Sequence, residues 1–143
     1  MRFSILKIHS LSGWTMFIFG ILAIGLGIVG IINPETTLQL LNFDVLERTQ
    51  RTDGDFTITF LIASSMASFN MGVYYVLAAL TNWKPFFYWT VPFRMVTFTV
   101  FTLAVVNQAA PQGFIGVAAW ELIGAIATGA ALWYERPQKS ATK

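Results

Sequence analysis

The chain has 143 residues, of which 55% are hydrophobic, 15% aromatic and only 11% charged. Soluble domains carry about twice that share of charged residues, so this composition excludes a water-soluble globule and a disordered chain. The sequence contains no cysteine and a single histidine, His9. Disulfides, thiolate metal sites and multi-histidine metal or haem sites are therefore excluded, and we predict neither a cofactor nor a metal ion.

Four segments of the chain are apolar, and each has roughly the 20 residues that a helix needs to cross a hydrocarbon core about 30 Å thick. They lie at 11–32, 57–80, 86–107 and 113–134. Unpaired backbone groups are costly in lipid, so these segments should be helices. The sequence thus predicts a single all-α domain, 1–143: an integral membrane protein built as a four-transmembrane-helix bundle.

The first apolar segment follows Arg2 and Lys7, as the apolar part of a signal peptide would. It continues to Ile32 without a small-residue cleavage site, which is longer than a signal peptide requires. We therefore interpret it as a retained first helix.

The charged residues are distributed unequally between the two sides of the predicted bundle. Four crossings place both termini on one side, where six basic residues face a single acid, Glu135. The basic residues on that side are Arg2, Lys7, Lys84, Arg136, Lys139 and Lys143. The other side has only Arg48 and Arg51 among several acids. The positive-inside rule then predicts a multi-pass protein of the bacterial inner membrane, with both termini and the polar tail 137–143 cytoplasmic. The scattered basic residues give no support to nucleic-acid binding.

The longest connection, 33–56, should lie outside and contain a short amphipathic helix. Asn33 can cap its start, and Pro34 suits the first helical position. Leu38, Leu41 and Val45 then recur at helical spacing. We expect this helix to lie over the outer end of the bundle, either as a lid on the helix ends or as a gate at a ligand entrance.

Three polar residues fall near the middle of the predicted helices. At a rise of about 1.5 Å per residue, Arg94 and Asn70 lie about 15 Å from the cytoplasmic side, and Glu121 lies about as far from the outer side. Charges at this depth need partners, so we predict an ion pair between Arg94 and Glu121. The guanidinium has more donors than one carboxylate can accept. Asn70, Tyr74, Thr97 or a water molecule should take the remainder.

Each of these polar residues lies on a helix face that is expected to contact other helices. Small residues follow Glu121 on its face, Thr97 shares the face of Arg94, and Asn70 shares its face with Ala63, Ala67 and Tyr74. This cluster has several interpretations. It is a latch that fixes helix register, a polar anchor for the head of a lipophilic ligand, a proton or solute path, or an acid–base site that uses Glu121.

Other patterns are typical of helix packing and of the membrane interface. Small residues form a stripe on the first helix and another on the second, as expected of close helix contacts. The stripes are Gly20, Ala23, Gly27 and Gly30, and Ser64, Ser68 and Gly72. The aromatic residues at 83–89 indicate an interfacial belt. Pro92 cannot donate to the carbonyl of Tyr88, so the third helix should kink there.

The whole pattern resembles the small bacterial four-helix membrane proteins of the DoxX-like group. The resemblance rests on a glycine-rich first helix that runs into Asn33-Pro34-Glu35 and on Gly72-Val73-Tyr74-Tyr75 in the second helix. It rests also on an arginine in the third helix and an acid in the fourth. The resemblance implies an accessory role beside membrane oxidoreductases, often near quinone chemistry, and it identifies no catalytic residue.

From these observations we predict a non-catalytic accessory or interaction subunit of an inner-membrane complex, because a chain with so few ionisable groups is poorly equipped for chemistry. The expected partners are the lipid bilayer and a larger membrane complex or a homo-oligomer. The alternative is a binding protein or enzyme for a hydrophobic small molecule such as a lipid, quinone or sterol-like compound. Its polar end would be held by Arg94, Glu121 and Asn70.

Overall fold

The computed structural model describes residues 7–136, and within them every regular element is helical. The elements are α1 (Leu11–Ile32), α2 (Pro34–Leu40), the 3₁₀ turn η1 (Arg48–Gln50), α3 (Thr57–Leu80), α4 (Lys84–Val106), the 3₁₀ turn η2 (Gln112–Phe114) and α5 (Ile115–Tyr134). Four of the helices are long and apolar enough to cross a membrane, as expected of a multi-pass protein. Their bounds lie within two residues of those predicted. The predicted polar tail 137–143 and the basic residue Arg2 lie outside the described residues.

Side chains at the helix ends explain why the helices begin and end where they do. The Ser10 hydroxyl caps α1 by accepting a hydrogen bond from the amide of Gly13, at 3.0 Å. Just past the end of three helices, a residue other than glycine adopts the left-handed conformation. These residues are Asn42, Asn82 and Gln108, with φ of 56°, 49° and 59°. In each case the next amide donates to a carbonyl in the last helical turn, which closes the helix and reverses the chain.

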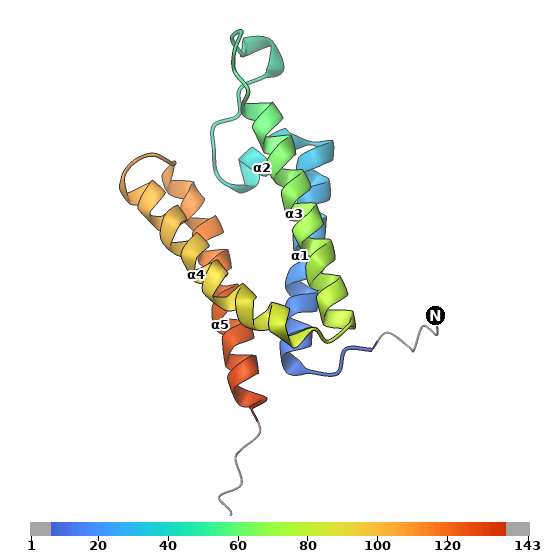
Figure 1. Ribbon diagram of the computed structural model, residues 1–143. Helices are drawn as coiled ribbons and strands as arrows, with labels where there is room; N and C mark the ends of the chain where they lie inside the picture. Colours follow the sequence, from blue (N-terminus) through green and yellow to red (C-terminus); the bar gives the residue numbers. More distant parts are fainter. Residues whose placement is uncertain (1–6, 137–143) are drawn as a thin grey trace, which may run out of the picture.

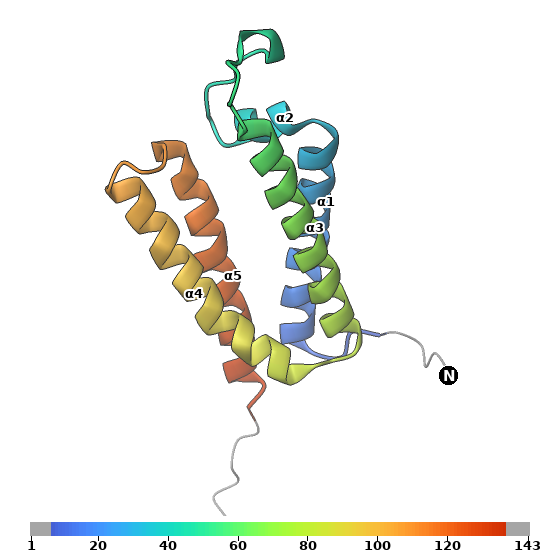
Figure 2. The ribbon, with the colours of Figure 1, turned by 45° about the horizontal axis from the view of Figure 1, so that its top comes forward.

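The long helices form two pairs, α1 with α3 and α4 with α5 (Figure 1). The pairs lie close together at the end that holds the α3–α4 turn, which we call the closed end, and they diverge toward the other end, the loop end (Figure 2). The hydrophobic core holds all four helices together and includes Met16 and Phe19 of α1, Tyr75 of α3, Phe87 of α4 and Leu132 of α5.

The pairing of α1 with α3 depends on the two small-residue stripes. A side chain added at Gly72 would lie 2.6 Å from the carbonyl oxygen of Gly20, and one added at Gly20 would lie 2.9 Å from the carbonyl oxygen of Gly72. The same close approach brings Gly27 against the backbone of Ser65 and Phe69. Ser68 also meets α1, because its hydroxyl donates to the carbonyl of Ala23 at 3.1 Å. The predicted contact is therefore confirmed for Ser68 and Gly72, but for Ser64 it was wrong: this residue is exposed, and Ser65 lies against α1 instead.

Helix α4 contains Pro92 and changes direction along its length (Figure 1). Proline has no amide hydrogen to donate to the carbonyl of Tyr88, and its ring clashes with that carbonyl. Both effects are common causes of a bend in a helix. The first turns of α4 lie at the closed end, and the remainder of the helix runs beside α5. The bend predicted at Pro92 therefore agrees with the fold.

The segment after α1 begins as the sequence predicts but ends earlier. Asn33 caps α2, with its side chain accepting from the amide of Thr36 at 3.3 Å, and Pro34 is the first helical residue. The helix stops at Leu40, because the left-handed Asn42 turns the chain, so the helical spacing predicted beyond Leu41 was wrong. Leu38 is buried, and the chain after it touches η2 through the pair Phe43 and Phe114, with ring centroids 6.3 Å apart.

Candidate functional site

Arg94 lies where the two helix pairs face each other, and it is only 3% exposed. Its guanidinium carbon lies 4.6 Å from the ring centroid of Phe19 on α1 and 4.8 Å from that of Tyr75 on α3. Its Nε donates to the Tyr75 hydroxyl at 3.3 Å. One side chain of α4 thus contacts both helices of the other pair, and the aromatic faces stabilise its charge.

The ion pair between Arg94 and Glu121 is present, but it is long. The Nε of Arg94 lies 3.8 Å from Oε2 of Glu121, which is beyond hydrogen-bonding distance. The side chain of Glu121 is 21% exposed and makes no hydrogen bond to any residue in 7–136. The Nη1 atom of Arg94 is buried and has no hydrogen-bond partner within the same residues. Both members of the pair therefore keep hydrogen-bonding capacity that the described protein atoms do not use.

Gly124 makes room for the guanidinium. A side chain at this position would overlap Nη1 of Arg94, and it would also approach the ring of Phe19 to 3.3 Å. Gly124 follows Glu121 by three residues, so the carboxylate and the gap lie on the same face of α5. The small residues near Glu121 in the sequence therefore serve Arg94 as well as helix contact.

A pocket of about 270 Å³ adjoins the ion pair and is lined mainly by α3 and α4. Its polar lining comes from Thr90, Arg94, Thr97, Glu121 and Tyr75, and its apolar lining from Met71, Phe86, Trp89 and Phe93. Trp89 and Phe93 are 67% and 65% exposed on the outside of the bundle. The pocket therefore reaches from the ion pair to the surface that the bilayer would cover.

The other residues predicted for this cluster lie in different places. Thr97 lines the pocket, but its hydroxyl donates to the carbonyl of Phe93 one turn back, at 3.0 Å, and makes no hydrogen bond to Arg94, contrary to the prediction. Asn70 is exposed, and Tyr74 is 54% exposed. Neither makes a side-chain hydrogen bond to Arg94. The prediction that these two residues complete the guanidinium's partners was therefore wrong, because their face of α3 points away from α1 and α4.

Tyr75, one residue further along α3, takes the place predicted for Tyr74. It lies three residues after Gly72, on the side of α3 that is packed inside the chain. The signal was present in the sequence, because Gly72 marks the small-residue stripe, and a residue three positions later shares that face. The stripe of Gly72 was predicted as a helix contact, and extending it by three residues would have identified Tyr75.

A second polar cluster lies at the closed end, and the sequence analysis missed it. Glu135, just after α5, accepts from the Ser12 amide at 2.7 Å and the Ser12 hydroxyl at 2.8 Å. It also pairs with the ammonium of Lys84, which donates in addition to Ser12 at 2.8 Å. Ser12 is fully buried. The cluster joins α1, α4 and α5, and no local pattern predicts it, since its members are separated widely along the chain.

The environment of Glu135 changes its acidity. Burial raises the pKa of Glu135, but hydrogen bonds from Lys84 and from the Ser12 backbone and side chain lower it, and the net pKa lies below the ordinary value. The carboxylate is thus held in its charged form with its oxygens in hydrogen bonds. This cluster has the properties of a structural clamp.

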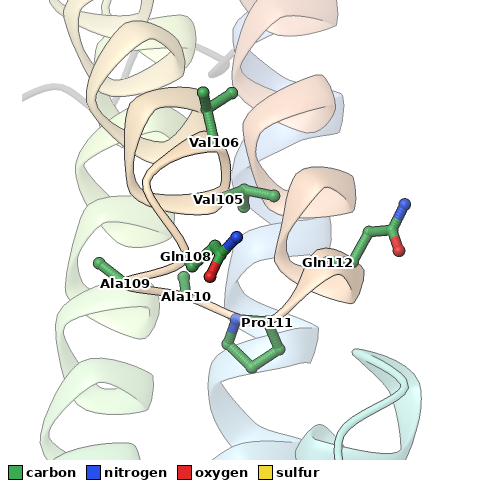
Figure 3. A pocket seen from close by; sticks show the side chains of 7 residues that line it. All are labelled: Val105, Val106, Gln108, Ala109, Ala110, Pro111 and Gln112. Atoms are coloured by element: carbon green, nitrogen blue, oxygen red, sulfur yellow. The ribbon is translucent and has the colours of Figure 1, made fainter.

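Another hollow, about 610 Å³, lies in the turn between α4 and η2 (Figure 3). Its lining comes from one short stretch, 105–112, and contains no charged side chain. Within residues 7–136, no three histidine, aspartate or glutamate side chains gather in a way that could hold a metal ion. The ion pair of Arg94 and Glu121 with its pocket is therefore the better candidate for a functional site.

Comparison with protein-family models, with curated protein sequences and with solved structures found no match. The resemblance to the DoxX-like group stays a prediction, and the functional argument depends on the geometry of the site.

Proposed function

We propose that this protein binds the polar end of a neutral, lipophilic molecule in the pocket between α3 and α4. The observation that carries the proposal is the unused hydrogen-bonding capacity beside the pocket: among the described residues, the buried Nη1 of Arg94 has no partner and the Glu121 carboxylate has no hydrogen bond. Buried polar groups are normally paired, so a bound oxygen atom or water is expected here.

The charges of the site favour a neutral head group. An anionic head would be attracted by Arg94 but repelled by Glu121, and a cationic head would meet the opposite conflict. A hydroxyl can donate to Glu121, and a hydroxyl or carbonyl oxygen can accept from Arg94. A lipid with an uncharged head, a quinone or a sterol-like compound has this chemistry, and its apolar part would lie along Trp89 and Phe93.

The proposed membrane is the bacterial inner membrane, with the closed end toward the cytoplasm. Support comes from the distribution of charge, since the acids Glu35, Asp44, Glu47, Asp53 and Asp55 belong to the loop end, and Lys7, Lys84 and Arg136 to the closed end. In this orientation the ligand would enter sideways from the bilayer.

Binding can be tested with tryptophan fluorescence in lipid nanodiscs, because Trp89 lines the pocket. A monoacylglycerol with a dibrominated chain should quench this fluorescence, and the Trp89→Phe variant should identify the signal. Glu121→Gln should weaken the quenching at least tenfold while the protein stays folded, because a neutral amide oxygen accepts the ligand's hydroxyl more weakly than the charged carboxylate does. Thr99→Val is the matched control, since this hydroxyl on α4 is exposed and is not part of the pocket.

The same titration can contradict the proposal. A dibrominated fatty acid that binds more tightly than the monoacylglycerol at pH 8 would overturn the neutral head group. Unchanged quenching in Glu121→Gln would remove Glu121 from the site. A loss of thermal stability in that variant, with no quenching by either probe in the wild type, would leave the pair as a structural latch.

A role as an accessory subunit of a larger membrane complex is our second proposal. It is supported by the small number of charged side chains in the long helices: α1 and α3 have none, α4 has Lys84 and Arg94, and α5 has Glu121. Extraction into native lipid discs should then bring a defined partner protein, identified by mass spectrometry. A single species of this chain alone would contradict the role.

A further inference from the structure

Helix α3 has an outward face that carries a polar residue at mid-depth. The face is formed by Ala63, Ala67, Asn70 and Tyr74, all exposed. It lies opposite the side of α3 that packs against α1 through Ser65 and Gly72. No other helix of the described chain covers it.

The amide of Asn70 makes no hydrogen bond within residues 7–136, although it lies near the middle of a membrane-spanning helix. Hydroxyl groups on exposed helix faces solve this problem locally: Ser64 donates to the carbonyl of Leu61 at 2.9 Å, and Thr99 to that of Met95 at 2.9 Å. In hydrocarbon an unpaired amide is costly, because no water is present to replace the missing partner.

We propose that this face docks against the same face of a second copy, with Asn70 hydrogen-bonded to Asn70 of the partner copy. The carboxamide carries both donors and an acceptor, so it is complementary to itself. A twofold axis brings identical residues together and allows two equivalent hydrogen bonds. Ala63 and Ala67, one turn apart, allow the two backbones to approach closely.

The uncharged character of the face argues for a second copy over a partner of different chemistry. None of its four residues carries a charge that would require an oppositely charged partner. The pocket next to Arg94 uses Met71 and Tyr75, which point to another side of α3, so the dimer leaves the ligand site open. This inference is therefore independent of the proposed function.

Disulfide crosslinking tests the dimer directly, because the natural chain contains no cysteine. Ala67→Cys in native membranes should form a disulfide-linked dimer on mild oxidation. Val100→Cys on α4 and Ile126→Cys on α5 are the matched controls, since both side chains are exposed on other faces of the bundle. Equal crosslinking at Ala67 and at the controls would overturn the proposal, as would a crosslinked product whose mass reveals a different protein.

The role of the amide is tested by replacing it. Asn70→Leu should lower the association constant of the dimer in liposomes about tenfold, whereas Asn70→Gln should largely preserve it. Energy transfer between labelled copies measures this constant. Because Asn70 faces outward, both variants should keep the wild-type circular dichroism spectrum. An Asn70→Leu variant that dimerises as well as the wild type would overturn the role of the amide.

Discussion

The two buried polar clusters of this protein differ in how completely their groups are paired. At the closed end, both carboxylate oxygens of Glu135 accept hydrogen bonds from Ser12 or Lys84. Between the helix pairs, Nε of Arg94 lies 3.8 Å from Oε2 of Glu121, which is too far for a hydrogen bond, and Nη1 of Arg94 has no partner within residues 7–136. A saturated cluster can only hold helices together, whereas an unsaturated one can also hold a ligand. The comparison thus assigns a structural role alone to the first cluster and, to the second, ligand binding in addition to holding helices together.

The largest expected effect tests whether the unsaturated cluster also stabilises the fold. Arg94→Met should lower the free energy of unfolding by about 3 kcal/mol, because Glu121 then loses the only charge that faces it among the described residues. The double variant Arg94→Met/Glu121→Met should recover most of this loss, since both charges are removed. Unfolding by SDS titration measures both values, and the quenching titration should show no ligand binding in either variant. A double variant that is less stable than Arg94→Met would contradict the argument.

The second prediction concerns the space that Gly124 leaves for Arg94. A methyl group in Gly124→Ala would overlap the guanidinium, which Phe19 and Tyr75 hold from both sides. We expect a loss of about 2 kcal/mol in the free energy of unfolding, together with weaker ligand quenching. Gly129→Ala on the same helix is the control, because a side chain there would meet only Val91 at ordinary contact distance. Equal behaviour of the two variants would show that Arg94 has room to move.

The third prediction concerns the saturated cluster and its dependence on pH. Glu135→Gln should lower the free energy of unfolding by about 1.5 kcal/mol, because an amide loses the charge-assisted bond with Lys84. The pKa of Glu135 is lower in the folded protein than its ordinary value, so its stabilisation is complete above the ordinary pKa and is lost as the pH falls through the folded pKa. The wild type should therefore lose more stability than Glu135→Gln between pH 7 and pH 3. Ligand quenching at pH 7 should be unchanged in the variant.

The positions of the helices could be predicted from the sequence, because the length of an apolar segment and its end signals are local properties. Asn33, which was predicted to cap the start of the outer helix, does so and also follows the last residue of α1. The rotation of each helix about its axis, in contrast, is not a local property of the sequence. It depends on which stripe of α3 meets the glycines of α1, and two stripes of small residues compete there. Both stripes were assigned to helix contacts, but only that of Gly72 has this role, so Asn70 and Tyr74 were predicted inside although they lie outside.

The candidate site was accordingly predicted in part. Arg94 and Glu121 could be paired because a charge at mid-depth has few other partners. Phe19 could not be assigned to the guanidinium without knowing how α1 and α4 face each other. Lys84 and Glu135 were read only as signals of orientation, since their contact with Ser12 joins three helix ends that are far apart in the sequence.

The smallest expected effect separates the two functions of the unsaturated cluster. Tyr75→Phe removes the hydroxyl that accepts from Nε of Arg94 but keeps the ring against the guanidinium. The free energy of unfolding should fall by about 1 kcal/mol, the usual value of one hydrogen bond. Because the freed Nε remains beside Glu121 and the pocket, a ligand oxygen can accept from it, and the bound state should recover part of the loss. The difference in stability between wild type and Tyr75→Phe should therefore shrink when the monoacylglycerol probe is present, and a difference that stays the same would show that the ligand does not reach Arg94.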